Sequence, residues 1–584
     1  MPMHKSENLV LFVLLLMFSL TALGYSIVVP LGEGPDEVSH FAYVQYVLMH
    51  RRLPPPAGAV SGEAHQPPLY YVIGALVTSW IPQEEFSPIA NPDFAFDDPQ
   101  TPNLLLHTRR EAFPYNGAAL AWHWGRGLSV VMGAITVWAV WHIASVFVSN
   151  DRWIVWGAAA FVAFLPAFTF LSAVVNNHNL VVMLSSVSVL QILHIAQRPP
   201  RRRDAALLGI LLGLAVLTKL SGLVVWLFVA VILAFLAWRS GQWKNWTTPA
   251  AVCFGIATII IAPWIIYNLA NHGDPLGWSL VLSVTPLRQA PLTFDDLVKV
   301  IGWGLYTSFW GRFGGALHLR MADAIYASLG GVLLFALLGW IRYGRSAQTP
   351  EQNNRTRALL ATFAVFWAMM LIAFARWTLT VLGTDQARQL FPGLPLFAIV
   401  FTIGLAHSSV KREKIVLATS CGGLFALNLA VLLYLNATFI GSPQNLVALP
   451  RLGGPAAPAD FGNVIRMLDY RVEPTRGAPG DSIIVQIQWQ ALEDITENYW
   501  LLLRLGSKES VVQKDGVPST GHPTTDWWQR GQVFTSHHTL VVPKDATPGT
   551  YTLWLGLHPF GQWEWLPVRG QEMFVLDRIT MTTP

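Results

Sequence analysis

Charged residues are scarce in this sequence. Asp, Glu, Lys and Arg make up 12% of the 584 residues, whereas apolar residues make up 53%. Soluble proteins carry about 25% charged residues, so this composition excludes an ordinary soluble protein and indicates a polytopic membrane protein. The small net charge of +4 comes from Lys and Arg that gather in short segments between apolar runs. That pattern is typical of membrane orientation, so we expect no nucleic-acid partner.

Cysteines and the common nucleotide-binding motifs are also rare or missing. The two cysteines, Cys253 and Cys421, lie within apolar runs, so no disulfide framework and no cysteine-based zinc site is expected. The chain has no G-x-G-x-x-G after a strand, no P-loop and no G-x-S-x-G elbow. These absences argue against a soluble enzyme that uses nucleotide sugars.

The apolar runs predict eleven membrane-spanning helices, because about 20 apolar residues cross a bilayer. The predicted spans are 9–30, 120–148, 153–174, 179–196, 204–218, 221–238, 249–270, 322–341, 358–375, 390–407 and 415–436. The first run lacks a small-residue cleavage site, so we expect it to be retained. Basic segments at 198–203, 239–244, 342–357 and 411–414 fall on one side if the N-terminus is cytoplasmic. We therefore expect a multi-pass protein of the cytoplasmic (plasma) membrane with its C-terminus outside.

This topology predicts two domains. Residues 1–450 form the transmembrane domain, with outer loops at 31–119, 271–321 and 376–389 and a short outer turn at 176–179. The apolar run 69–81 is too short to span and is expected to lie along the interface. Residues 451–584 form an extracytoplasmic domain, in which short alternating runs between 464 and 580 are separated by Pro/Gly/Asp turns. That spacing predicts an antiparallel β-sandwich of about 115 residues behind a Gly/Pro/Ala linker near 453–459.

An acidic pair follows the first predicted span. Gly32, Gly34 and Pro35 break the incoming helix, and Asp36 with Glu37 stands where a new helix begins. Asp36 could simply cap that helix. A carboxylate at the membrane surface can also accept a proton from an acceptor hydroxyl, so both residues are catalytic candidates. The sequence does not distinguish which of the two is the base.

Three cations are predicted on the same side of the membrane as the acidic pair. Lys219 lies between two apolar runs, where a charge is costly and therefore a functional candidate, although it could also reach the interface through its long side chain. Arg312 and Arg388 lie in the later outer loops, and Arg can bind phosphate oxygens through two hydrogen bonds. We expect these three residues to bind the phosphate of a lipid-linked donor.

Histidines and amides complete the predicted site. His40, His65, Gln66, Asn177 and His178 lie in the predicted outer segments and are candidates for substrate binding. Histidine and carboxylate ligands suit several divalent ions, so a metal site built from these histidines and His272 with the acidic pair is an open alternative. Because the chain has no H-E-x-x-H and no histidine cluster in sequence, we expect no bound metal and no certain cofactor.

These residues carry a resemblance to a known superfamily. The acidic pair after the first span, Leu217-Thr218-Lys219, Ala262-Pro263-Trp264 with Asn268, the segment 273–277 and the segment 386–392 resemble membrane glycosyltransferases of the GT-C fold. The similarity is to the branch with protein O-mannosyltransferases and the aminoarabinose transferases of lipid A. It covers roughly residues 9–436. Tyr267 stands where such proteins often have Arg, so a donor contact there is not carried over.

The resemblance implies a function. In that superfamily an acidic residue of the first outer loop is catalytic and the donor is a sugar on a polyprenyl phosphate. It therefore implies a glycosyltransferase that moves a sugar from such a donor to a lipid, glycan or protein acceptor of the cell envelope. Two other readings of the sequence stay open, namely a transporter or flippase of lipid-linked sugars and a non-catalytic envelope-assembly protein. Transporters place ionisable residues near the midplane and show internal repeats, neither of which is evident here.

Overall fold

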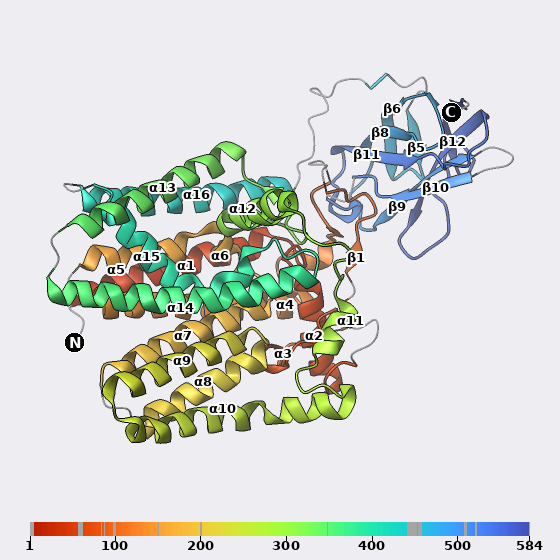
Figure 1. Cartoon of the computed structure of the whole chain (residues 1–584). Helices are drawn as coiled ribbons and strands as arrows, with labels where there is room; N and C mark the ends of the chain where they lie inside the picture. Colours follow the sequence, from red (N-terminus) through yellow and green to blue (C-terminus); the bar gives the residue numbers. More distant parts are fainter. Residues whose placement is uncertain are drawn as a thin grey trace.

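A computed structural model gives the fold as a bundle of helices beside a smaller domain of strands (Figure 1). The structure describes residues 5–55, 62–82, 84–86, 88–96, 101–148, 151–198, 201–346, 349–409, 412–440, 452–453, 458–506, 511–519 and 523–582. The predicted domain boundary at 450/451, most of the predicted linker and Lys411 of the last basic segment lie outside these residues. The boundary therefore stays a prediction.

Helices form the first part of the chain. They are α1 (Lys5–Val28), α2 (Glu37–His50), α3 (Leu69–Thr78), α4 (Gly117–Phe147), α5 (Arg152–Phe164), α6 (Pro166–Leu171), α7 (Asn177–Ala196), α8 (Arg202–Thr218), α9 (Gly222–Ser240), α10 (Trp243–His272), α11 (Trp278–Val284), α12 (Trp303–Gly311), α13 (Asp323–Arg345), α14 (Pro350–Thr380), α15 (Leu394–His407) and α16 (Glu413–Ile440). Short 3-10 or π turns are η1 (Arg109–Glu111), η2 (Asp296–Gly302) and η3 (Ala387–Gly393).

Within the described residues, nine helices are long and apolar enough to cross a membrane. They are α1, α4, α7, α9, α10, α13, α14, η3 with α15, and α16. The other two predicted spans are also helical, but they differ in form. Pro166 divides the predicted span 153–174 into α5 and α6, because proline has no backbone N–H for the helix, and α8 has only 17 residues. The prediction of a polytopic helical membrane protein is confirmed, whereas the exact number of eleven spans is not.

The centre of the bundle is formed by α4, α5, α7 and α15, which pack against one another or against shared neighbours. Their buried faces form one continuous apolar core with parts of α1, α13 and α16. Glycines allow the closest contact: a side chain on Gly339 of α13 would meet the backbone of Gly404 on α15. Small residues at helix crossings are typical of membrane bundles, so this packing agrees with the composition.

The remaining elements are two short hairpins between the helices and the strands of the C-terminal part. The hairpins are β1 (Ile89–Ala90) with β2 (Leu105–Leu106) and β3 (Arg312–Phe313) with β4 (Leu319–Arg320). The C-terminal part contains β5 (Ala459–Phe461), β6 (Ile465–Glu473), β7 (Arg476–Gly477), β8 (Ser482–Ala491), β9 (Tyr499–Gly506), β10 (Val511–Gly516), η5 (Thr525–Trp527), β11 (Val533–Val541), β12 (Gly549–Pro559) and β13 (Phe574–Met581).

The C-terminal strands form two sheets with a shared apolar core. The five-stranded sheet has the order β10-β9-β12-β13-β7, and the four-stranded sheet has the order β11-β8-β6-β5. Buried residues from both sheets, including Trp489, Leu503 and Leu555, belong to one hydrophobic cluster. The predicted sheet-rich C-terminal domain is therefore confirmed. It lies at one end of the helix bundle, next to β1, and we call this end the sandwich end (Figure 1).

Candidate active site

The turn at residues 31–36 connects α1 to α2 at the sandwich end of the bundle (Figure 1). Gly32 has φ +85°, and a side chain there would meet Leu105 and Val38 at less than 3 Å. Asp36 has φ 58°, a left-handed conformation that is uncommon for residues other than glycine. Asp36 occupies the N-cap position of α2, but its side chain makes no capping hydrogen bond. The carboxylate is therefore turned away from the helix and is available for another role.

Arg388, from η3, lies against the Asp36 carboxylate. Arg388 Nη2 donates to Asp36 Oδ2 at 2.5 Å, and Arg388 Nε donates to Gln386 at 2.7 Å. The Arg388 side chain is 12% exposed, whereas that of Asp36 is 49% exposed. Desolvation raises the pKa of Asp36, but the charge and hydrogen bond of Arg388, together with smaller effects of His40 and Lys219, more than offset it and the pKa falls to about 2. Asp36 is thus an ionised carboxylate that is half open to the surroundings.

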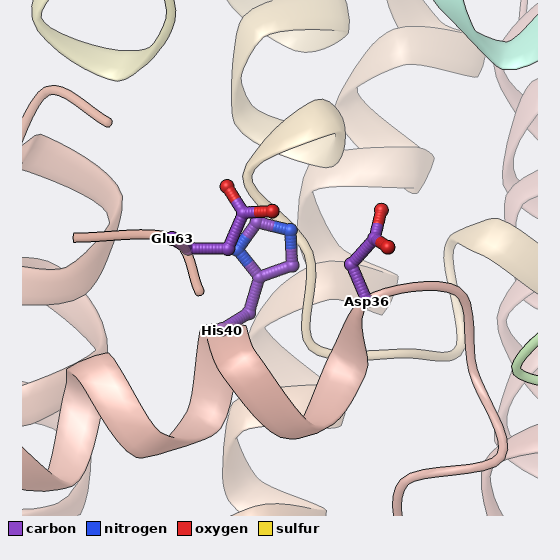
Figure 2. Close-up of side chains that lie close together, drawn as sticks. All are labelled: Asp36, His40 and Glu63. Atoms are coloured by element: carbon purple, nitrogen blue, oxygen red, sulfur yellow. The ribbon is translucent and has the colours of Figure 1, made fainter. Parts of the chain in front are cut away.

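His40 lies one turn further along α2 and is buried. Its Nδ1 is 2.9 Å from the hydroxyl of Tyr71, and the two rings stack at 5.8 Å. Burial lowers the pKa of His40 to about 4, so the imidazole is neutral at pH 7. Figure 2 shows Asp36, His40 and Glu63 close together, with Asp36 and His40 on the same side of α2. One ligand atom from each residue lies within 4.8 Å of the others.

Lys219 follows α8 and points at the same group of side chains. Its Nζ lies 2.8 Å from Nε2 of His178, which is buried at the start of α7. Burial lowers the pKa of Lys219 to about 8, against the opposing effect of Glu63. Within the described residues, His178 Nδ1 has no hydrogen-bond partner. An ammonium that donates to Nε2 places the imidazole hydrogen on Nδ1, so the pair offers two donors to a ligand.

The predicted polar residues of two other segments join this group. Gln66 Nε2 is 2.9 Å from the His65 ring, and Asn177 Nδ2 donates to Tyr71 at 3.3 Å and to Gln66 at 3.4 Å. Burial and, secondarily, the charge of Lys219 lower the pKa of His65 to about 4. The fold thus brings Asp36, His40, His65, Gln66, Asn177, His178, Lys219 and Arg388 into one cluster, which we call the mouth cluster.

Glu37 is predicted as a catalytic residue, but the structure places it outside the mouth cluster. Its carboxylate is fully buried and receives two hydrogen bonds of 2.7 Å from Arg126 of α4. It also accepts backbone N–H groups from Gly32 at 3.1 Å, Gly34 at 3.3 Å and Val175 at 2.9 Å. Arg126 in turn donates to three backbone carbonyls at the end of α1. This geometry holds the turn in place and leaves Glu37 no open face for a substrate.

Arg312 is predicted to bind phosphate, but it does not join the mouth cluster. Its Nη1 lies 3.3 Å from Oδ2 of Asp385, and both side chains are partly buried. Asp385 also accepts from Ser308 through its backbone carbonyl, and Ser308 accepts from the backbone of Ala387. Arg312 therefore supports the segment that presents Arg388.

Three residues of the site are not among those predicted from the sequence. Glu63 lies two residues before His65, Tyr71 lies in the apolar run 69–81, and Arg126 lies inside the second predicted span. A charge within a membrane span is a functional candidate by default, so the sequence alone was sufficient to single out Arg126. Tyr71 carried none, because an aromatic residue in an apolar run is usually part of the core.

Asp36, His40 and Glu63 are the described residues that could hold a metal ion. Two carboxylates and an imidazole suit several divalent cations. However, Asp36 is already paired with Arg388, and Lys219 is electrostatically coupled to both Asp36 and Glu63. Two cations beside a trio of ligands oppose a further positive charge, so the residues fit a metal poorly and no step below depends on one.

Comparison with known protein families gives a match to one part of the chain. Residues 124–267, about a quarter of the chain, match the family of dolichyl-phosphate-mannose-protein mannosyltransferases. This part of the chain is therefore similar to that family. This match confirms the resemblance given above, and it spans α4 to α10 with Asn177, His178 and Lys219 but neither Asp36 nor Arg388. No curated protein matches the chain.

Solved structures show distant likenesses. ArnT from Cupriavidus metallidurans in the apo state is similar at 14% identity over 73% of this chain and 70% of that one, with a TM-score of 0.41. The oligosaccharyltransferase of Archaeoglobus fulgidus, crystallised with Zn and sulfate, is similar at 13% identity over 73% of this chain and 52% of that one, with a TM-score of 0.39. The chain thus spans about half the length of that oligosaccharyltransferase.

A third likeness covers a smaller part of the chain. The C-terminal domain of Wzt is similar at 14% identity over 24% of this chain and 89% of that one, with a TM-score of 0.17. Likenesses with scores this low do not extend to activity or ligands.

Proposed function

We propose that this protein transfers a sugar from a polyprenyl-phosphate donor to an acceptor hydroxyl at a membrane surface. The observation that carries the proposal is the mouth cluster, in which a half-exposed, ionised Asp36 lies beside the cations Arg388 and Lys219. The family match supports it, because it connects this chain to transferases named for a dolichyl-phosphate sugar. The sugar donor itself is part of the proposal.

The chemistry of the transfer assigns a role to each group. The acceptor oxygen forms a bond to the anomeric carbon of the sugar, while the bond from that carbon to the phosphate oxygen breaks. The electron pair of the broken bond goes to the polyprenyl phosphate, and the hydroxyl proton goes to Asp36. The phosphate charge that develops is stabilised by Lys219 and Arg388, since preorganised cations act most strongly where charge forms. A carboxylate in this role contributes about 10²- to 10⁴-fold to the rate.

The remaining residues of the mouth cluster suit the sugar. His40 and His65 are neutral at pH 7 because burial lowers both pKa values to about 4. Neutral imidazoles and the amides of Gln66 and Asn177 can both donate and accept hydrogen bonds, as hydroxyl groups require. We therefore assign them to hydroxyl recognition rather than to charge.

Sugar transfer in reconstituted membranes tests the proposal. Purified protein is incubated with polyprenyl-phosphate hexoses or pentoses that carry a radiolabel and with native membranes as acceptor. We expect labelled product from the wild type and a loss of at least about 100-fold in Asp36→Asn, because the amide cannot accept the proton. Asp295→Asn is a matched control, since Asp295 forms an exposed pair with Lys299 and should leave transfer unchanged.

Two results would contradict the proposal. Equal transfer by wild type and Asp36→Asn would remove Asp36 as the base. No transfer from any donor, together with movement of the labelled lipid across vesicles, would instead indicate a transporter of lipid-linked sugars. Protein levels and monodispersity are compared in both variants so that loss of folding is not mistaken for loss of chemistry.

A further inference from the structure

The turn that presents Asp36 is held from two sides. On the bundle side, Glu37 accepts the backbone N–H groups of Gly32 and Gly34, as described above. On the other side is Glu33, which is fully buried and whose Oε1 accepts from Leu105 N at 2.9 Å and from His107 Nε2 at 3.2 Å. A left-handed residue other than glycine is strained and persists only where its surroundings fix it, so both sets of contacts help to hold Asp36 in place.

His107 is a charged link in this arrangement. Its Nδ1 lies 2.9 Å from Oε2 of Glu111, so each ring nitrogen faces a carboxylate. Burial alone would lower the pKa of His107, but Glu111 and Glu33 raise it to about 10. The ring is therefore an imidazolium at neutral pH, and it donates to both carboxylates.

The sandwich holds the same residue through its backbone. The carbonyl of His107 accepts from Oγ1 of Thr524 at 2.6 Å and from Nε1 of Trp527 at 3.2 Å. Two residues further, the backbone N–H of Arg109 donates to Oδ2 of Asp526 at 2.7 Å. Oγ1 of Thr524 also lies 2.7 Å from Oδ1 of Asp526, so its one hydroxyl hydrogen is shared between two acceptors that face it. These contacts connect η5 of the sandwich to the residue whose ring holds Glu33.

A second contact lies at the other strand of the small hairpin. Asp93, which follows β1 and is 5% exposed, has Oδ1 at 3.0 Å from Nδ1 of His538 and at 3.4 Å from Nζ of Lys514. Its Oδ2 accepts from Val517 N at 3.2 Å. Because β1 pairs with β2 in the register Ala90↔Leu105, the hairpin joins this contact to the backbone that binds Glu33. In Figure 1, β1 lies between the bundle and the sandwich.

We infer that the C-terminal sandwich positions the catalytic base: η5 holds His107, His107 holds Glu33, and Glu33 holds the turn that presents Asp36. This inference rests on the proposed function, since it concerns the placement of that base. A tether would need only the covalent chain between the two domains. The structure instead has a series of buried polar contacts that runs from Asp526 through Thr524 and His107 to Glu33 in the turn. Displacement of a catalytic group by about 1 Å can cost about 100-fold in rate, so small losses of this support should be measurable.

Asp526→Asn in the full-length protein tests the inference with two readouts. Transfer kinetics should show a fall in kcat of at least about 5-fold with little change in the KM of the donor, because the base is displaced while Lys219 still binds phosphate. Hydrogen exchange of the backbone at 31–36 should become faster. The matched control is Asp460→Asn, which removes a carboxylate from a surface pair with Arg466 in the same sandwich and should change neither readout.

A second variant separates positioning from general damage. His107→Gln removes the charged link to Glu33, so Asp526→Asn should add less than about 2-fold to its effect, whereas independent defects multiply. Unchanged kcat and unchanged exchange at 31–36 in Asp526→Asn would overturn the inference while Asp36-dependent transfer still supports the proposed function. If the wild type transfers no sugar but exchange at 31–36 responds to Asp526→Asn and not to Asp460→Asn, the proposed function fails and the structural link stands.

Discussion

Asp36 differs from its neighbour Glu37 in one decisive respect, the direction of its carboxylate. The left-handed backbone at Asp36 turns the side chain toward Arg388, whereas the helical Glu37 points into the bundle toward Arg126. The sequence places both residues at the start of a helix and cannot separate them. The partner of Asp36 is 352 residues away in the sequence and that of Glu37 is 89 residues away, so only the folded chain shows which pairs form.

Lys219 shows how much a single residue can reveal in advance. A lysine between two apolar runs is costly in a membrane, so its function could be suspected from the sequence alone. Its contact with His178 could not be predicted, because Lys219 follows α8 whereas His178 lies at the start of α7. The sequence also predicts the same phosphate-binding role for Arg312 and Arg388, because both lie in outer loops. Their different ion-pair partners are known only from the structure.

The pH dependence of donor binding follows from Lys219. Burial lowers its pKa to about 8, so the ammonium is present below this pH and is lost as the pH rises through it. We expect the KM of the donor to rise above about pH 8, while Asp36, with a pKa of about 2, stays ionised throughout. In Lys219→Arg the guanidinium remains charged, so the alkaline rise in KM should disappear even if the KM itself changes. The measurement is KM against pH from 6 to 10 for both proteins. An identical alkaline rise in both would exclude Lys219 as its origin.

Removal of metal ions tests the role of Asp36, His40 and Glu63 as a set. Because Arg388 and Lys219 already supply positive charge beside this trio, we expect transfer to be unchanged after treatment with EDTA. Transfer is measured before and after chelation, and again after addition of Mg²⁺, Mn²⁺ or Zn²⁺. Loss of transfer with EDTA that one of these ions restores would show that the trio binds a metal.

At the scale of elements, most helices follow from composition, and the exceptions have local causes. Long apolar runs predict α4, α7 and α9 within a few residues. Pro166 is a sequence signal for the break between α5 and α6, since proline interrupts the helical hydrogen bonds. The apolar residues on both sides nevertheless resemble one continuous span. The strands of the sandwich follow from alternation and turn residues. The pairing order of its sheets does not, because distant strands become neighbours.

The contact between α2 and α4 includes a buried ion pair and should therefore be sensitive to mutation. Glu37 and Arg126 are both fully buried, so Glu37→Gln leaves an unpaired guanidinium in the interior. Loss of one partner of a buried pair costs about 3–5 kcal/mol, and we expect a marked fall in the midpoint of thermal unfolding in detergent. Glu351→Gln removes a carboxylate from an exposed pair with Arg355 and should change stability by less than about 1 kcal/mol.

The same variant distinguishes the two members of the acidic pair. If Glu37→Gln is as stable as the wild type but transfers no sugar, Glu37 is the base and the assignment of Asp36 is wrong. If Glu37→Gln is destabilised and the folded fraction transfers sugar at a normal rate, Glu37 acts only through the position of the turn.

At the scale of the whole molecule, the mouth cluster and the sandwich lie at one end of the bundle, and the connection from α13 to α14 lies at the other (Figure 1). That connection is flanked by Arg342, Arg345, Arg355 and Arg357. Because basic residues mark the cytoplasmic side, we expect the sandwich and the site to face away from the cytoplasm.

Reporter fusions measure this orientation. Alkaline phosphatase is active only outside the cytoplasm, so a fusion after Pro584 should be active, and a fusion after Ser346 should be inactive. A green fluorescent protein that folds only in the cytoplasm should give the opposite result at both positions. Phosphatase activity at Ser346 alone would place the sandwich and Asp36 in the cytoplasm. The donor would then have to be presented on that face, and the link from the sandwich to Asp36 would act there as well, because both belong to the same end of the bundle.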